Sequence, residues 1–515
     1  MLTNYINEPL TDFTRKNNIA AMKSALDAVN EQIGLEYPLV IGGERYTTEN
    51  SIKSLNPSEY DQVIGIVSGA SIELADKAVK AADIAFRTWK YEVPAIRANY
   101  LFKAAAIMRR RKYEFSAWLI KEAGKTWIEA DADTAEAIDF LEYYGRRILD
   151  LSSGVPISQV QGENNECYYI PLGVGLIIAP WNFPLAILTG MSAAAIVTGN
   201  TIIMKPASTT PVIAAKLMEI WEEIGLPSGV VNYLPCSGSK VGDYLVTHSK
   251  VRFINFTGSK DIGLRINRLA AEISTGQKWI KRVTAEMGGK DAILVDKNAD
   301  LDAAADGIVT SAFGFQGQKC SACSRAIIVE DVYDKMLEKI VERTKTLKIE
   351  DPVEADVNIG PVIDEKAYEK ITAYIETGKD EGRLIIGGER GKEGGYFIYP
   401  AIFSDVDRNS RIAQEEIFGP VLAIIKAVDF SDALDIANDT VYGLTGAVYS
   451  NDRCVLEKAK REFYVGNLYL NRKCTGALVG VNPFGGFNMS GTDSKAGGPD
   501  YLTLFMQLKS VTEKY

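Results

Sequence analysis

Residues 174–205 read VGLIIAPWNFPLAILTGMSAAAIVTGNTIIMK, and this stretch decides the fold class. Its first part (174–179) and its last part (200–205) are short apolar runs that predict buried strands, with a helix between them. The runs VVNYLP (230–235) and VRFINF (251–256) predict two more strands, again separated by a helical segment. Repeated alternation of strand and helix predicts a parallel, doubly wound sheet with helices on both faces.

A second alternating region starts near residue 286. DAILVD (291–296) and AIIVED (326–331) predict strands, and Asp300 is placed to cap a helix over 301–313. The residues alone therefore predict two α/β domains that share a crevice.

The composition narrows the classes of function. The chain has 67 acidic and 57 basic residues, and the net charge of −10 argues against nucleic acid or an anionic membrane as the partner. Any serine-histidine triad, cysteine-histidine pair or histidine-rich metal site would have to use His248, the one histidine of the sequence. We therefore expect chemistry that depends on neither histidine nor a metal ion.

The sequence also indicates a cytoplasmic protein. Its six cysteines show no framework spacing, which is typical of reduced thiols, and the start MLTNYINEPLTDFT has neither a basic nor an apolar leader segment. Residues 167–204 contain no charge, but Pro171, Pro180 and Pro184 interrupt the run. This pattern predicts buried strands and a helix rather than a membrane span.

Cys320 is the candidate nucleophile. It lies in the glycine-containing loop GFQGQKCSACSR (314–325), where backbone N–H groups and Lys319 are expected to favour its thiolate. The alternative is a small buried hydrophobic residue, as most free cysteines are. Cys323 forms a C-x-x-C pair with Cys320, but a zinc site would need a second such pair, which the sequence lacks.

Two polar residues match this nucleophile. Without histidine, a buried carboxylate has to act as base, and Glu286 in TAEMGGKD is the candidate, although most acidic residues are solvated or cap helices. Asn182 in APWNFPL either braces its loop or donates an N–H to a developing oxyanion.

Two short segments of the sequence indicate a cofactor site, although each segment taken alone is a weak signal. Gly258 and Ser259 lie in FTGSKDIG, between a strand and a helix, as in a turn that binds phosphate, but the G-x-G-x-x-G fingerprint is absent. Lys205 ends a strand, where it reaches either a ribose or phosphate group or only solvent.

Seven motifs in register resemble the aldehyde dehydrogenase superfamily: PWNFP (180–184), TIIMKPA (201–207), FTGS (256–259), EMGGKD (286–291), GQKC (317–320), EEIFGP (415–420) and PFGGFNMSG (483–491). The resemblance implies an aldehyde-dehydrogenase-like fold with two doubly wound α/β domains and a small oligomerisation arm. It assigns 1–150 and 172–285 to a dinucleotide-binding domain and 286–480 to the catalytic domain. Residues 151–171 and 481–515 then form the arm, the substrate-anchor loop and the C-terminal tail.

Three further stretches, 129–144, 317–325 and 474–502, resemble the branch of this superfamily that oxidises glutamate γ-semialdehyde to glutamate, the second step of proline degradation. The resemblance implies that Cys320 attacks the aldehyde to form a thiohemiacetal, whose oxyanion binds the Asn182 amide. A thioester follows, and Glu286 activates the water that hydrolyses it.

The resemblance also implies ligand contacts. For NAD these are Lys205 and Glu416 at the ribose hydroxyls, Gly258 and Ser259 at the pyrophosphate, and Phe418 near the nicotinamide ribose. Ser208 stands where many NAD-preferring relatives carry an acidic residue, so NADP stays possible, with NAD as first choice. For the substrate the implied contacts are Ser321, Gly476 and Ala477 at the α-carboxylate, Glu136 at the amine and Phe487 at the aliphatic stem. A homodimer or higher homo-oligomer is expected, and no metal.

Three alternatives stay open at this level. The first is a dehydrogenase for another semialdehyde or aliphatic aldehyde, which would differ in the anchor loop. The second is a non-enzymatic relative that binds a dinucleotide, although such a protein needs none of Cys320, Glu286 and Asn182. The third is a thiol-disulfide protein, for which Cys323→Ser would be as damaging as Cys320→Ser.

Overall fold

The first seven-stranded sheet contains the predicted strands and runs in the order β11-β10-β7-β8-β9-β2-β3. The structure is a computed structural model, and it describes residues 3–515. Strands β7 to β11 are parallel, while β2 and β3 are antiparallel at one edge, so the predicted doubly wound sheet is confirmed. The strands are β2 (Leu39–Ile41), β3 (Glu44–Tyr46), β7 (Val174–Ile178), β8 (Thr201–Lys205), β9 (Val231–Tyr233), β10 (Val251–Thr257) and β11 (Arg282–Glu286).

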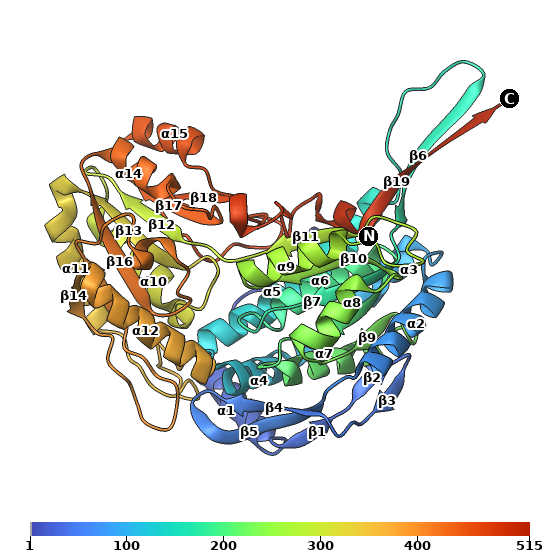
Figure 1. Cartoon of the computed structure of the whole chain (residues 1–515), viewed down its shortest axis with the longest axis horizontal. Coiled ribbons are helices and arrows are strands. Elements are labelled where there is room, and N and C mark those ends of the chain that lie inside the picture. The colour runs from blue at the N-terminus through green and yellow to red at the C-terminus, as the bar shows by residue number, and fades with distance from the viewer. Residues whose placement is uncertain (1–2) are drawn as a thin grey trace.

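Helices cover both faces of this sheet (Figure 1). One face packs against α2 (Ile72–Trp89), α8 (Asp243–Thr247) and α9 (Lys260–Ala271). On the other face, α6 (Ala186–Val197) and α7 (Pro211–Glu223) contact the strands. Four more helices of the same hydrophobic cluster pack on these two or on one another: α1 (Lys16–Asn30), α3 (Pro94–Arg110), α4 (Lys112–Ala123) and α5 (Trp127–Leu151). Because α6 has no charged residue, it lies in the middle of this layer with nearly every side chain buried.

The second sheet has the order β14-β15-β16-β13-β12-β17-β18, and only β14 is antiparallel. Its strands are β12 (Asp291–Val295), β13 (Cys323–Val329), β14 (Arg383–Ile386), β15 (Ala401–Ser404), β16 (Val421–Ala427), β17 (Thr445–Tyr449) and β18 (Asn467–Leu470). One face packs against α10 (Leu301–Phe313) and α11 (Tyr333–Lys345). The other packs against α12 (Glu365–Glu381), α13 (Arg411–Gln414), α14 (Phe430–Asn438) and α15 (Arg453–Glu462). The Asp300 carboxylate caps α10 as predicted, accepting from the N–H groups of Asp302 and Ala303.

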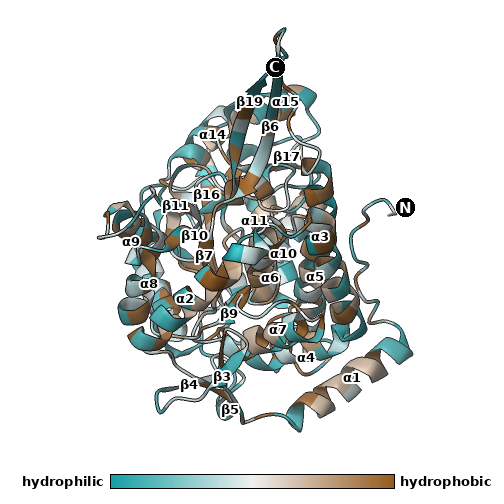
Figure 2. Cartoon of the chain, turned by 90° about the vertical axis from the view of Figure 1, so that its right-hand side faces the viewer, coloured by the Kyte–Doolittle hydropathy of each residue, from teal (hydrophilic) through white to brown (hydrophobic). Residues whose placement is uncertain are grey.

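Two smaller sheets complete the molecule. The first, in the order β1-β5-β4, consists of β1 (Leu35–Tyr37), β4 (Ser51–Asn56) and β5 (Glu59–Ser68). The second is an antiparallel ribbon of β6 (Glu163–Pro171) and β19 (Met506–Lys514) that extends away from the body (Figures 1 and 2). The two segments predicted to form an arm therefore pair with each other.

Five short turns of 3-10 or π geometry lie between these elements: η1 (Gly238–Gly242), η2 (Gly314–Gly317), η3 (Glu330–Val332), η4 (Asn488–Ser490) and η5 (Tyr501–Phe505).

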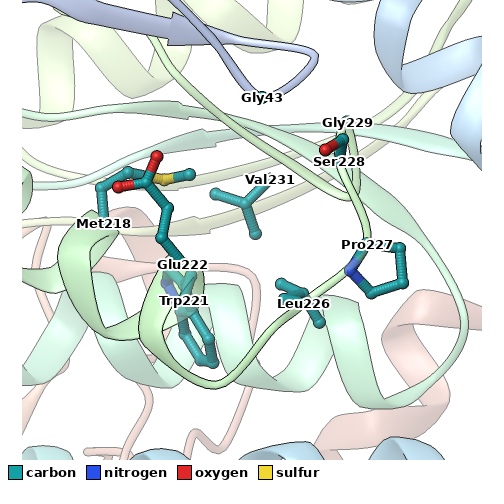
Figure 3. Close-up of a pocket in the computed structure, with 9 residues that line it drawn as sticks. All are labelled: Gly43, Met218, Trp221, Glu222, Leu226, Pro227, Ser228, Gly229 and Val231. Carbon is teal, nitrogen blue, oxygen red and sulfur yellow. The ribbon is translucent and has the colours of Figure 1, made fainter.

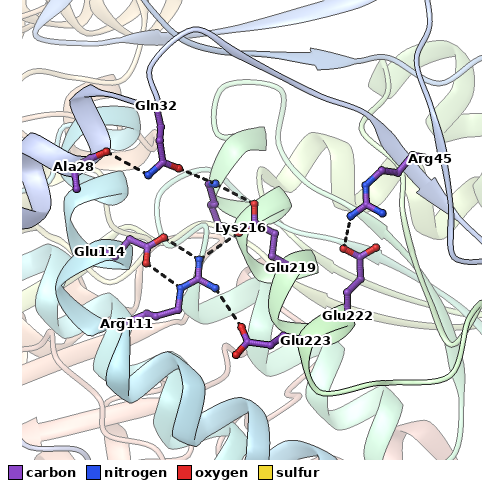
Figure 4. A network of polar contacts seen from close by, with 9 residues as sticks. All are labelled: Ala28, Gln32, Arg45, Arg111, Glu114, Lys216, Glu219, Glu222 and Glu223. Carbon is purple, nitrogen blue, oxygen red and sulfur yellow. Dashed lines mark hydrogen bonds and ion pairs between the residues drawn. The ribbon is translucent and has the colours of Figure 1, made fainter.

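Charged side chains join α4 to α7 at the surface (Figure 4). The Arg111 guanidinium contacts the carboxylates of Glu114 at 2.8 Å, Glu219 at 3.2 Å and Glu223 at 3.7 Å. A single exposed ion pair contributes little to the stability of a fold. A guanidinium shared by several carboxylates contributes more, because one ordered side chain serves several partners. The buried Glu122 carboxylate of α4 strengthens the same junction, accepting from the N–H groups of Val212 and Ile213 at the start of α7.

The uncharged stretch 167–204 supplies most of β6, then β7, α6 and β8, as the sequence predicted. No helix among residues 3–515 has both the length and the apolar character of a membrane span.

Candidate active site

The Cys320 loop lies between α10 and β13 and is held in an unusual backbone conformation. After α10 ends at Phe313, Phe315 and Gln316 have positive φ angles of 49° and 57°. The Gln316 side-chain amide stabilises this turn, donating to the carbonyls of Gly124 at 3.2 Å and Pro361 at 2.6 Å. Cys320 follows this turn and is half-buried as a residue. Left-handed backbone at non-glycine residues costs energy and is often found at functional sites.

The thiol of Cys320 is neutral at rest. Burial raises its pKa well above the ordinary range, and the carboxylates of Asp291, Glu416 and Glu286 raise it further. The Lys319 ammonium, which was expected to favour the thiolate, pairs with Glu129 at 3.2 Å. The nucleophile therefore needs a base to take its proton.

Glu286 ends β11 and lies in a pocket of donors from the C-terminal loop. Its Oε1 accepts from the Ser494 hydroxyl at 2.6 Å and the Ser494 N–H at 3.3 Å, and its Oε2 accepts from the Gly486 N–H at 3.1 Å. Burial raises the pKa of Glu286 to about 7, although these hydrogen bonds oppose the rise. A carboxyl group with this pKa accepts and releases protons near neutral pH, as a general base must.

The glycine pair after Glu286 brings the two sheets together. A Cβ on Gly289 would lie 2.6 Å from the Cys320 carbonyl oxygen, and a Cβ on Gly288 would overlap the Glu416 carboxylate. The Gly289 N–H donates to Glu416 Oε1 at 3.1 Å. Only residues without side chains fit this junction of the Glu286 strand, the Cys320 loop and Glu416.

Asn182 lies beside the same loop and is buried. Its Nδ2 donates to the carbonyl of Gln318 at 3.0 Å, two residues before Cys320. An amide nitrogen carries two N–H groups, so this bond fixes the side chain and leaves its second N–H available as a donor.

Three of the residues predicted to hold the cofactor lie at the carboxyl ends of parallel strands of the first sheet. Lys205 ends β8, Gly258 and Ser259 follow β10, and the Gly258 N–H donates to the Glu286 carbonyl at 3.0 Å. Ser259 precedes α9 and is exposed, as is Ser208. Glu416 and Phe418 come from the loop before β16, where the Phe418 ring meets Trp181 at 5.4 Å between centroids.

The chemistry of these residues fits a dinucleotide. Within the described residues, the buried Lys205 ammonium donates only to the Pro206 carbonyl, at 3.3 Å, so further N–H donors remain for hydroxyl oxygens. Glu416 uses Oε1 for the Gly289 N–H, and a carboxylate accepts from ribose hydroxyls through its other oxygen. Ser259 opens a helix, where N–H groups favour phosphate.

The predicted substrate residues fall into two groups. Ser321 is next to Cys320, and its carbonyl accepts from the Cys474 thiol at 3.4 Å, which ties the Cys320 loop to the loop of Gly476 and Ala477. Glu136 projects from α5 with partial exposure, and Phe487 packs against Tyr464 at 5.1 Å between centroids and near the Lys495 ammonium. The structure thus brings Ser321 and the anchor loop to Cys320, whereas the ring of Phe487 contacts Tyr464 and Lys495.

The sequence did not reveal three residues of this region. Ser494 binds Glu286, and Lys125 and Phe183 form a buried cation–aromatic contact next to Asn182. The sequence offered two signs of these residues, namely the position of Phe183 within APWNFPL and the lone basic residue in AGKTW. The contacts themselves join residues that are far apart in sequence, so they required the structure.

A separate cavity of about 170 Å³ lies at the end of α7 (Figure 3). It is lined by Gly43, Met218, Trp221, Glu222, Leu226, Pro227, Ser228, Gly229 and Val231. None of the residues predicted for catalysis or ligand binding is among them.

Comparisons with known proteins agree with this geometry. The chain matches the aldehyde dehydrogenase family over residues 45–511 and belongs to that family. It is 62% identical over 515 residues to a 1-pyrroline-5-carboxylate dehydrogenase of Geobacillus thermodenitrificans, with 100% of both chains covered. The structure of 1-pyrroline-5-carboxylate dehydrogenase from Thermus with bound NAD has a TM-score of 0.99 and 51% identity, again with 100% of both chains covered. Betaine aldehyde dehydrogenase of Staphylococcus aureus in complex with NAD+ has a TM-score of 0.90 and 28% identity, covering 96% of this chain and 97% of that chain. The resemblance inferred from the seven motifs and the fold expected from it are confirmed.

Proposed function

We propose that this chain catalyses the NAD-dependent oxidation of L-glutamate γ-semialdehyde, the open form of 1-pyrroline-5-carboxylate, to L-glutamate in proline degradation. The observation that carries the proposal is 62% identity over the whole chain to a relative named for this substrate. The positions of Cys320, Asn182 and Glu286 supply the chemistry that such a reaction requires.

The reaction begins with a proton transfer, because the Cys320 thiol is neutral at rest. Glu286, with its pKa raised to about 7, is the base we assign to this step. The sulfur then attacks the aldehyde carbon, and the Asn182 amide holds the oxyanion of the thiohemiacetal. NAD, when bound, supplies the acceptor for the hydride that leaves the substrate carbon. Glu286 then releases the thiol proton to solvent, and its carboxylate takes a proton from the water that hydrolyses the thioester on Cys320. Glutamate leaves, and Cys320 regains its thiol proton from solvent.

For the cofactor, we assign Lys205 and Glu416 to the ribose hydroxyls and Gly258 with Ser259 to the pyrophosphate. Phe418 would lie near the nicotinamide ribose and Ser208 near the adenosine ribose. Two observations support these assignments. The buried Lys205 ammonium donates only to the Pro206 carbonyl among the described residues, and Glu416 accepts from the Gly289 N–H through Oε1 alone.

For the substrate, we assign Ser321 and the backbone of Gly476 and Ala477 to the α-carboxylate. Gly476 has a φ of 78°, and a turn with such backbone presents N–H groups to an anion. Glu136 remains the candidate for the amine and Phe487 for the aliphatic stem.

Initial rates of NADH formation test the proposal. Glutamate semialdehyde should be preferred over succinate semialdehyde, which lacks the amine, and NAD over NADP. Clear preference for succinate semialdehyde would overturn the substrate assignment and favour the related alternative. The variant Cys320→Ser should be inactive while Cys323→Ser keeps most of its activity, because Cys323 is buried behind the loop.

We also infer a homo-oligomer in the cytoplasm. The β6–β19 ribbon has two free edges, and a lone two-stranded ribbon is only marginally stable in water, so a second copy is the partner expected to cover it. All six cysteines are unpaired, which suits a reducing compartment.

A further inference from the structure

Residues 5–11 precede α1 without forming a helix or a strand, and two buried carboxylates of α5 hold them in place (Figure 2). Asp131 accepts from the N–H and the hydroxyl of Thr11 at 2.7 and 2.6 Å. Asp139, about two turns further along the helix, accepts from the Glu8 N–H at 2.6 Å. Hydrogen bonds from the backbone to ionised carboxylates are strong, so this segment is a fixed part of the folded body.

The N-terminal segment also contacts the loop that we assign to the substrate carboxylate. The Tyr5 hydroxyl donates to the Val479 carbonyl at 3.1 Å, and the Asn7 side-chain nitrogen donates to the same oxygen at 3.0 Å. Asn7 also donates to Asp139 Oδ2 at 2.9 Å, which fixes its amide between α5 and the loop. Within residues 3–515, no other group donates to the Val479 carbonyl. This peptide is therefore held by the start of the chain.

The segment and the loop are in close contact. Val479 is buried, and the Tyr5 ring meets the Tyr143 ring of α5 edge to face at 5.2 Å between centroids. A Cβ on Gly480 would lie 2.8 Å from the Tyr5 ring and 3.0 Å from the Tyr143 ring. The loop backbone at Gly480 thus rests directly on the two tyrosine rings.

Peptides on both sides of Ala477 are fixed by side chains from outside the loop. The Arg472 guanidinium donates to the Gly476 carbonyl at 3.0 Å, and the two N-terminal donors hold the Val479 carbonyl. Ala477 lies between these points, and its N–H is one that we assign to the substrate carboxylate. Backbone N–H groups bind an anion when successive peptides are oriented toward it. The orientation of the peptides around Ala477 therefore depends on the N-terminal segment.

We propose that Tyr5 and Asn7 are positioning residues for substrate binding: through the Val479 carbonyl, they hold the anchor loop of Gly476 and Ala477 in the orientation that binds the substrate carboxylate. This inference rests on the proposed function. It adds that residues at the start of the chain determine how tightly a carboxylate binds to a loop near its end.

The test compares the double variant Tyr5→Phe/Asn7→Ala with the wild type on three aldehydes. Glutamate semialdehyde carries a carboxylate and an amine, glutarate semialdehyde has the same chain and carboxylate without the amine, and pentanal has neither group. We expect KM for both semialdehydes to rise about ten-fold while kcat changes less than about two-fold, because misplaced N–H donors weaken binding of the ground state and the transition state alike. For pentanal, kcat/KM should change less than about three-fold.

Binding of L-glutamate, the product of the proposed reaction, provides a measurement without turnover. Its Kd, measured by calorimetry, should rise about ten-fold in the double variant, as KM does. The Kd of NAD should stay unchanged, because the residues that we assign to the cofactor lie in other loops.

Tyr113→Phe/Asn18→Ala is the matched control. The Tyr113 hydroxyl donates to Asn18 Oδ1 at 3.1 Å, and the Asn18 amide donates to the Asp12 carbonyl at 2.9 Å. The same two types of side chain thus join the start of α1 to α4, and neither donates to the anchor loop. This variant should leave KM for all three aldehydes unchanged.

Unchanged KM values for both semialdehydes, or an equal loss of kcat/KM with pentanal, would overturn the inference and leave Tyr5 and Asn7 as structural residues. An equal rise of KM in the control would also contradict it. If the double variant does not fold, Tyr5→Phe decides the question, since it keeps the ring contact with Tyr143 and removes only the donor. That variant should raise KM for both semialdehydes about three-fold, and an unchanged KM refutes the role. Failure of the wild type to oxidise glutamate semialdehyde would instead refute the proposed function.

Discussion

The Ser494 hydroxyl, 2.6 Å from Glu286 Oε1, holds down the pKa of the proposed base. Removing this donor in Ser494→Ala should raise the pKa of Glu286 further above its ordinary value. Since only the ionised carboxylate accepts a proton, activity is lost as pH falls through that pKa, and the acidic limb of the kcat profile should move up by about one pH unit. A profile of kcat against pH measures this. Ser490→Ala, which removes a hydroxyl of the same loop that contacts Gly443 instead, should leave the limb in place.

Replacing the base itself separates the two halves of the reaction. Glu286→Gln keeps the size of the side chain but cannot take a proton from water, so hydrolysis of the thioester should slow by about 10²–10⁴-fold. Because Glu286 is also the base assigned to the Cys320 thiol, rapid mixing with glutamate semialdehyde and NAD should show a slower burst of NADH than the wild type gives. A stalled enzyme should follow, with the acyl group detectable on Cys320 by mass spectrometry. Normal steady turnover would mean that another group activates the water.

At the scale of elements, one buried carboxylate joins three segments. Glu122 of α4 accepts from the N–H groups of Val212 and Ile213 at 2.7 and 2.8 Å and from the Ser54 hydroxyl of β4 at 2.7 Å. Glu122→Ala would leave the two buried N–H groups of Val212 and Ile213 unpaired and should destabilise the fold by about 3 kcal/mol. Thermal unfolding should then begin several degrees lower. Glu223→Ala, at the exposed end of α7, serves as control, and an equal shift for both would contradict the role of Glu122.

How much of the structure can be predicted from the sequence depends on how far apart the interacting residues lie along the chain. Strands β7 and β8 were predictable because fully buried parallel strands are nearly continuous apolar runs, and α10 because Asp300 caps it locally. The three-stranded sheet of β1, β4 and β5 was not predicted, since its strands mix polar and apolar residues without a clean period. The partner of Lys319 was unpredictable for a related reason: Glu129 is 190 residues away, and only the assembled fold brings it near. The motifs marked Cys320, Glu286 and Asn182, but their partners Ser494 and Gln318 required the structure.

At the scale of the whole molecule, the ribbon is where a second copy should attach. Strand β19 pairs with β6 from Met506–Pro171 to Lys514–Glu163, and Leu508 and Tyr168 expose apolar surface on it. Removing residues 507–515 takes away the edge that a partner would extend, while Met506 and its contact with Arg282 remain. We expect light scattering to give the mass of one chain for this truncation and of a dimer or larger assembly for the full chain. A control without residues 514–515 should keep the larger mass. Because every proposed catalytic residue comes from a single chain, the truncated protein should still form NADH, and an assembly of unchanged mass would show that the ribbon does not hold the copies together.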